Sequence, residues 1–266
     1  MTEVHKETKQ LSSIRTEKTV GGEMIDIISY ELTDSTNLRA LEYAKCERPN
    51  RPTVFIAKEQ TAGRGRLGRS FLSPSGGIYM TILTKTVPGC EFLSVTTYAA
   101  TVIARVIEST TGLKAKIKWV NDIYVGDRKL AGILTQGAVD PDTGKVAYVA
   151  MGVGINVQGK ELPDEISEIA TTIEREGTSA DIDSLAGTVI YQYISSLHTA
   201  TDKAVADEYR SRSMLIGECV SVIKPGGSYT ATVEGITDKC ELILKLPSGE
   251  KEILMTGEVS VRKKIL

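Results

Sequence analysis

The sequence predicts an α+β protein, in which a mixed, largely antiparallel sheet with helices precedes a small C-terminal β domain. An alternating strand is predicted at 24–32, and two further strands at 53–60 and 77–85 run into and out of an arginine-rich loop. A helical period of apolar residues covers 91–110. From about residue 215 the chain turns into short β runs separated by tight turns. The length of 266 residues suffices for one good core with a small appended domain.

Local signals set the order of the elements in the first half of the chain. Residues 1–22 are polar, with mixed charge and no periodicity, and predict a polar leader. The "DSTN" stretch at 34–37 supplies N-cap residues for a helix that begins with "LRALEYAKC". The domain boundaries that we expect are 23–214 for the main domain and 215–266 for the C-terminal one.

Three strand-like runs in the centre predict an antiparallel meander. They cover 115–125, 129–139 and 145–157, and the tight polar turns "GDR" and "DPDTG" separate them. A charged loop is expected at 158–180, and loops of that length in a compact domain are usually functional or mobile. A second amphipathic helix is expected at 181–200. The runs beyond it, broken by "KPGGS" and "LPSGE", are typical of a small barrel.

Composition excludes several classes of function. The 32 basic and 34 acidic residues nearly balance, whereas proteins that bind bulk nucleic acid are usually basic. With no paired Cys or His beside His5 or His198, neither a zinc site nor a Ser-His-Asp triad is expected. No run is long enough to span a membrane and no signal-peptide core is present, so we expect a soluble, cytoplasmic protein. The four cysteines are widely spaced and typical of thiols in a reducing cytosol: Cys46, Cys90, Cys219 and Cys240.

The stretch "AGRGRLGRSFLSPSGG" at 62–77 matches the spacing of a dinucleotide fingerprint at Gly63, Gly65 and Gly68. A dinucleotide loop needs a helix directly after the third glycine, and the proline, serines and glycines that follow oppose one. A nucleic-acid site is disfavoured too, because no aromatic residues are interleaved for base stacking. The remaining interpretation is a flexible loop that closes over a small ligand bearing phosphates, with arginines to neutralise its charge.

Five motifs occur together and in order: "DSTN" (34–37), "EQTAGRGRLGR" (59–69) with "SPSGGIYMT" (73–81), "KWVNDIYV" (118–125), "RKLAGIL" (128–134) and "GVGINV" (152–157). Over roughly residues 30–200 the chain resembles the catalytic core of biotin protein ligases. The resemblance implies a class II aminoacyl-tRNA synthetase-like fold with a C-terminal SH3-like β-barrel. Val120 stands where the family usually has proline and Phe71 where it has tryptophan, and both keep apolar bulk. The leader is too short for the helix-turn-helix of many bacterial members, so we expect a ligase without a DNA-binding arm.

The implied reaction has two halves. Biotin and ATP give biotinyl-5′-AMP and pyrophosphate, and a lysine of a biotin carboxyl carrier protein or domain then attacks the mixed anhydride. Because the carboxylate is already ionised at neutral pH, positioning and fixed positive charge dominate, with Mg²⁺ expected on the phosphates. The alternatives left open are a lipoate or octanoyl ligase of the same fold and a non-catalytic nucleotide- or nucleic-acid-binding protein. An edge strand of the meander could support a homodimer.

The resemblance implies overlapping sets of site residues. Its catalytic set is Lys129, Arg64, Arg66 and Asp122, with Asp122 also the candidate metal ligand. The biotin-binding set is Ser35, Thr36, Asn37, Gln60, Gly63, Arg64, Gly65, Arg66, Lys129, Gly132 and Gly152. The ATP-binding set is Arg64, Arg66, Arg69, Lys118, Asn121, Lys129 and Asn156. In this scheme Lys129 is the central cation, between the biotin carboxylate and the adjoining phosphate.

Overall fold

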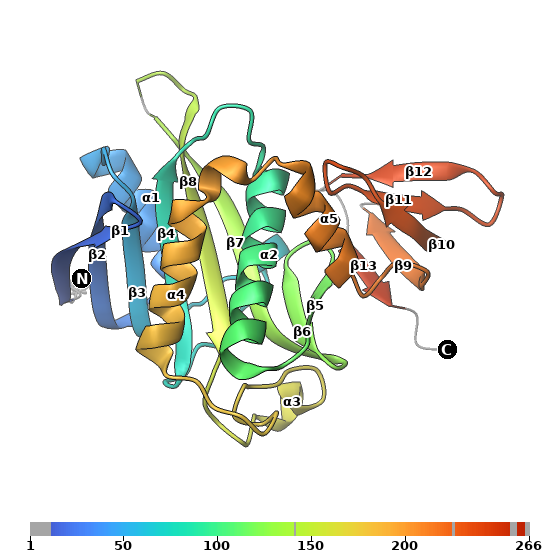
Figure 1. Ribbon diagram of the computed structural model, residues 1–266, viewed down its shortest axis with the longest axis horizontal. Helices are drawn as coiled ribbons and strands as arrows, with labels where there is room; N and C mark the ends of the chain where they lie inside the picture. Colours follow the sequence, from blue (N-terminus) through green and yellow to red (C-terminus); the bar gives the residue numbers. More distant parts are fainter. Residues whose placement is uncertain (1–11, 141, 225–226, 256–259, 264–266) are drawn as a thin grey trace, which may run out of the picture.

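An eight-stranded sheet forms the centre of the computed structural model, which describes residues 12–140, 142–224, 227–255 and 260–263 (Figure 1). The strands run in the order β1-β2-β3-β4-β8-β7-β6-β5, and β2 and β3 are parallel while all other neighbours are antiparallel. This mixed, largely antiparallel sheet confirms the predicted fold class. The strands are β1 (Ser13–Val20), β2 (Glu23–Thr33), β3 (Thr53–Gln60), β4 (Gly77–Lys85), β5 (Ala115–Lys118), β6 (Asp122–Val125), β7 (Arg128–Val139) and β8 (Val146–Asn156).

Helices cover both faces of the sheet. Helix α2 (Phe92–Thr111) and helix α4 (Ile182–Ser195) pack on one face, where most of the apolar core lies (Figure 1). Helix α1 (Thr36–Glu47) connects the parallel strands β2 and β3 and packs on the opposite face over a smaller core. These three helices begin within a residue or two of the positions predicted from the sequence.

Strand β1 differs from the sequence-based expectation, which assigned residues 1–22 to a polar leader. Residues 13–20 pair with β2 along their whole length, although nearly every side chain of β1 is exposed. Backbone pairing and charged side chains hold the strand, with little apolar burial. The buried carboxylate of Asp26 accepts hydrogen bonds from Arg15 at 3.1 Å and from Arg51 at 2.7 and 2.9 Å. Such a strand has no hydrophobic period, so its sequence carries no signal for it.

Two further differences lie in the second half of the domain. The run at 115–125, expected as one strand, is split into β5 and β6 by a turn at 119–121. Trp119 in this turn is buried and its indole Nε1 donates to the carbonyl of Cys240, 2.9 Å away in the C-terminal domain. Helix α5 (Lys203–Arg212) and the short helix α3 (Asp164–Ser167), which lies inside the expected loop 158–180, were not predicted.

The C-terminal residues form a separate antiparallel sheet beside α5 (Figure 1). Its strands are β9 (Cys219–Lys224), β10 (Gly227–Ile236), β11 (Leu242–Lys245), β12 (Lys251–Leu254) and β13 (Ser260–Lys263), in the order β12-β11-β10-β9-β13. This is the small β domain that the sequence predicted; its boundary at residue 215 stays a prediction. Within the described ranges, no helix combines the length and the apolarity needed to cross a membrane.

Candidate active site

A cavity of about 1070 Å³ opens on the face of the sheet that carries α1, above β4, β8 and β7. The N-terminus of α1, the loop at 62–72 and the turn between β5 and β6 surround it. All but two of the residues predicted for the site line this cavity, and the exceptions are Gly63 and Asn156. Segments far apart in the sequence therefore meet here, as expected for one binding site.

Three glycines form the floor of the cavity, and they belong to two neighbouring rows of paired residues across the sheet. In the first row Gly152 of β8 lies between Thr81 of β4 and Leu134 of β7. In the second row Gly154 of β8 pairs with Gly132 of β7. A Cβ atom at position 152 would lie 2.0 Å from the amide oxygen of Asn37, and one at position 154 would lie 2.4 Å from the ring of Phe71.

Because glycine has no side chain, the side chains of two other residues can pack directly against the sheet at these positions. The Asn37 amide, from the first turn of α1, covers the first row, and the Phe71 ring, from the loop, covers the second. Gly152, which the resemblance assigned to biotin through its backbone, makes room for Asn37 while also lining the cavity. Phe71 entered the sequence analysis only as a departure from a family pattern, because its place on the sheet depends on the path of the loop.

One end of the cavity is polar and uncharged. Gln60, at the end of β3, accepts hydrogen bonds from the backbone nitrogen of Thr36 at 2.9 Å and from its hydroxyl at 3.2 Å. Ser35 is the N-cap residue of α1, as predicted, but its side chain makes no capping hydrogen bond. Ser35 and Thr36 are buried and line the cavity beside Gln60. Hydroxyls and an amide in such a slot can bind a neutral ligand that both donates and accepts hydrogen bonds.

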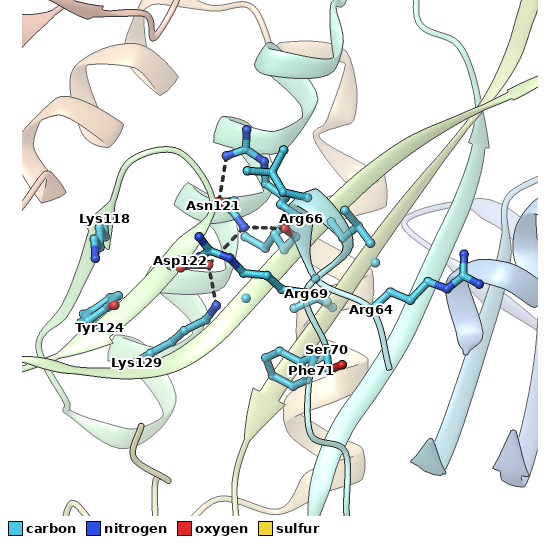
Figure 2. Close-up of a pocket in the computed structure, with 18 of the residues that line it drawn as sticks. Arg64, Arg66, Arg69, Ser70, Phe71, Lys118, Asn121, Asp122, Tyr124 and Lys129 are labelled. Atoms are coloured by element: carbon cyan, nitrogen blue, oxygen red, sulfur yellow. Dashed lines mark hydrogen bonds and ion pairs between the residues drawn. The ribbon is translucent and has the colours of Figure 1, made fainter. Parts of the chain in front are cut away.

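The other end of the cavity is cationic. The Nζ atom of Lys129 lies 2.8 Å from a carboxylate oxygen of Asp122, and Lys129 approaches the face of the Phe71 ring at 5.8 Å. Asn121 donates to Asp122 at 3.1 Å and to the carbonyl of Ile133 at 2.8 Å. Arg66 donates to the amide oxygen of Asn121 at 3.2 Å. Lys129 thus pairs with Asp122 directly, and Arg66 is linked to the same carboxylate through Asn121 (Figure 2).

The three arginines of the loop do not behave alike. Figure 2 shows the side chains of Arg66 and Arg69 lying toward Asn121 and Asp122, whereas the side chain of Arg64 extends away from Lys129. All three line the cavity. The resemblance implied that Arg64 and Arg66 belong to the catalytic set and Arg69 to the ATP-binding set alone, and those roles stay predictions. In the conformation described here, Arg69 is the arginine that accompanies Arg66.

Burial changes the electrostatics of this end. Desolvation lowers the pKa of Arg66, and the nearby charge of Asp122 partly opposes that change. The guanidinium still remains charged at neutral pH, because arginine starts from a very high pKa. Next to it, burial raises the pKa of Tyr124 to about 12, so its hydroxyl stays protonated while Lys118 lies 5.4 Å above its ring. Arg66 therefore contributes positive charge at this end of the site.

Gly63 and Asn156 lie beside the cavity and shape its walls. The carbonyl of Gly63 accepts from the backbone nitrogen of Phe71 at 2.9 Å, and a Cβ at position 63 would lie 2.3 Å from the Phe71 carbonyl oxygen. Asn156, at the end of β8, donates to the carbonyl of Thr171 at 3.0 Å and so anchors the segment 158–180. Their proposed contacts with biotin and ATP stay predictions.

The segment 158–180 supplies a lining residue that the sequence analysis did not single out. The carbonyl of Ile169 accepts a hydrogen bond from the backbone nitrogen of Lys129 at 2.9 Å, which places this segment against the cationic end. The Ile169 side chain is 63% exposed although it lines the cavity. Nothing in the local sequence marks this isoleucine, because the segment as a whole lacks a period.

Comparison with known proteins agrees with this geometry. Residues 29–156 match the family described as "Biotin/lipoate A/B protein ligase family", and residues 215–262 match "Biotin protein ligase C terminal domain". A biotin--[acetyl-CoA-carboxylase] ligase of Mycobacterium tuberculosis is 30% identical over 90% of this chain and 89% of its own length. A bifunctional ligase/repressor BirA of Bacillus spizizenii is 29% identical over 85% of this chain and 71% of its own length. The match to BirA of Bacillus subtilis, at 34% identity, spans 46% of that protein.

Among solved structures, a biotin protein ligase from Aquifex aeolicus in complex with biotin and ATP superimposes with a TM-score of 0.78. It is 26% identical and is covered over 99% of its chain and 90% of this one. The mixed sheet with its glycine floor, polar slot and cation cluster defines an ATP-dependent acid–protein ligase of the biotin and lipoate class. Within that class, the chain belongs to the biotin protein ligases.

Proposed function

We propose that this protein activates biotin as biotinyl-5′-AMP at the expense of ATP and transfers it to a lysine of a biotin carboxyl carrier domain of a carboxylase. One observation carries the proposal: a single cavity joins a neutral polar slot to a cluster of fixed cations. Biotin has the matching polarity, with a neutral ureido ring at one end and a carboxylate at the other. The cavity is also large enough to admit ATP beside it.

In the first half-reaction, a carboxylate oxygen of biotin attacks the α-phosphorus of ATP. The bond between the α- and β-phosphates breaks and pyrophosphate leaves. Lys129 offsets the repulsion between the carboxylate and the phosphate, and Arg66 and Arg69 add positive charge from the loop. Asp122 holds the Lys129 amine in place through the 2.8 Å contact, and Asn121 orients Asp122 in turn.

The nucleotide is assigned to the side of the cavity formed by the segment 158–180. Ile169 supports this assignment, because an exposed aliphatic side chain fixed next to Lys129 can cover an adenine ring. A closed segment there would also keep the acyl phosphate from water.

The residues around the cationic end could hold a magnesium ion only together with ATP. The described residues contain no group of three or more His, Cys, Asp or Glu side chains that could hold a metal. An ion held mainly by ATP phosphates and water, with Asp122 as its one protein carboxylate, agrees with the usual coordination of Mg²⁺. Such an ion would neutralise charge on the phosphates.

In the second half-reaction, the amine of the acceptor lysine attacks the carbonyl carbon of the anhydride. The bond from that carbon to the phosphate oxygen breaks, AMP leaves, and the nitrogen gives up its extra proton as the amide forms. The absence of nucleic-acid partners and the homodimer through an edge strand of the meander stay predictions.

Pyrophosphate exchange tests the proposal directly. The protein is incubated with ATP, Mg²⁺ and radiolabelled pyrophosphate, together with biotin, lipoate or no acid. Incorporation of label into ATP that depends on biotin is the expected result. Exchange that depends on lipoate would instead select the lipoate ligase, and no exchange with either acid would favour a non-catalytic binder.

A further inference from the structure

A chain of hydrogen-bonded side chains runs behind the polar slot. It begins at Ser73, passes through Gln60 and Thr36 to Thr81, and continues from Asn37 to Gln136. Thr81 and Gln136 do not line the cavity, and Thr81 is completely buried. Any effect that these two residues have on a ligand must therefore pass through the residues that line the cavity.

Two backbone carbonyls determine which groups donate and which accept along this series of hydrogen bonds. A carbonyl can only accept, so the Asn37 atom 3.3 Å from the Leu134 carbonyl is its Nδ2 group, which also donates to Gln136 at 2.9 Å. The Asn37 amide oxygen then faces Thr81 at 2.7 Å, and Thr81 must donate to it. Having given its one proton to Asn37, Thr81 can only accept in its 2.9 Å contact with the Thr36 hydroxyl.

The other end of the chain is ordered in the same way. The Ser73 hydroxyl donates to the carbonyl of Phe71 at 3.0 Å and accepts from Gln60 Nε2 at 2.9 Å. The Gln60 amide oxygen accepts from the backbone nitrogen of Thr36. The Thr36 hydroxyl gives its one proton to Thr81, because that contact of 2.9 Å is shorter than its 3.2 Å contact with the Gln60 oxygen and Thr81 has no proton left to give. Toward the cavity Thr36 can therefore only accept a hydrogen bond.

We infer that Thr81 and Gln136 are positioning residues that set the hydrogen-bonding polarity of the slot, and with it the choice of acid. Thr36 is left as an acceptor. The amide of Gln60 has two hydrogens and gives one to Ser73, so the second is left to donate to a ligand. A matching ligand presents an N–H next to a C=O, as a cyclic urea does. The dithiolane ring of lipoate has neither group and leaves both partners without a hydrogen bond, which is costly in a buried slot.

The inference rests on the proposed function and is tested by changing Thr81 in the whole protein. Thr81→Val removes the hydroxyl at nearly constant volume, and Thr81→Ser restores it. Thr101→Val is the matched control, because Thr101 is equally buried but donates only to a helix carbonyl, that of Thr97. Each variant is assayed by pyrophosphate exchange for the KM of biotin, for kcat, and for the rate with lipoate.

The expected result is a rise of about tenfold in the KM of biotin for Thr81→Val, with kcat within about twofold of the unmodified protein. Thr81→Ser should return the KM to within about threefold, Thr101→Val should leave it unchanged, and the preference for biotin over lipoate should shrink in Thr81→Val. A KM within twofold for Thr81→Val, or an equal rise in Thr101→Val, would overturn the inference.

Gln136 gives an independent test that holds even where Thr81→Val does not fold. Gln136→Leu removes the acceptor for Asn37, whereas Gln136→Glu keeps one. We expect a higher KM for biotin in the leucine variant alone, and equal values in the two variants would overturn the inference. Failure of the proposed function is distinguishable, since the unmodified protein would then show no exchange with biotin at all.

Discussion

Replacing Lys129 by alanine removes the cation around which the cationic end is organised. Lys129 is 30% exposed and its partner Asp122 is 25% exposed, so the site is intermediate between water and a dry interior. For an effective dielectric constant of about 20, one pair of unit charges 4 Å apart interacts by about 4 kcal/mol. Loss of that interaction in the transition state corresponds to a rate lower by about a thousandfold.

The substitution also leaves the Asp122 carboxylate unpaired at the place where two anions must meet. Where this unpaired charge outweighs any contact of Asp122 with magnesium, Lys129→Ala combined with Asp122→Asn is faster than Lys129→Ala alone, by about tenfold. The assay is biotin-dependent pyrophosphate exchange at saturating biotin and ATP, with circular dichroism to verify folding. Lys116→Ala is the control, because this exposed lysine lies on β5 outside the cavity lining and should have full activity.

Activity of Lys129→Ala within a few-fold of the unmodified protein, in a folded variant, would remove Lys129 from the site. A double variant no faster than the single one would show instead that Asp122 has a favourable role of its own, as a magnesium ligand would. The two comparisons therefore separate the role of the cation from that of its partner.

Three further predictions address the loop and the fold. Arg66→Gly removes the hydrogen bond to Asn121 and should weaken retention of the adenylate ten- to hundredfold, so that a bystander protein is biotinylated; a variant that makes no adenylate would place Arg66 in the first chemical step. Biotin with ATP should slow tryptic cleavage of the loop 62–72, and equal rates with and without ligand would contradict loop closure. Hydrogen bonds from Arg51 hold the pKa of Asp26 below its usual value, which contributes stability that is present above about pH 4 and lost as pH falls through the folded-state pKa. Asp26→Asn should therefore lower the Tm at pH 7 and differ less from the unmodified protein at pH 3, and a pH-independent difference would refute this account.

Helices α1, α2 and α4 and most strands of the main sheet could be predicted because their signals are local. Helix α2 follows the helical apolar period of 91–110, and α1 begins within the "DSTN" stretch, with Ser35 at its N-cap position. Strand β1 could not, because its side chains are exposed and show no apolar period. The split of the run 115–125 was missed as well, and the turn there carries Trp119, whose hydrogen-bond partner lies 121 residues away along the chain.

The candidate site divides in the same way. The sequence by itself predicted which motifs meet at one site, with Lys129 and the loop arginines among its residues. Only the tertiary structure decided that Arg69, and not Arg64, lies beside Arg66. It also decided that Asn37 covers Gly152 and orders the protons of the slot. The physical reason is strand register. Which side chains meet across β4, β8 and β7 depends on the pairing of segments that are distant in the sequence. The sequence of one such segment does not show which segment it pairs with.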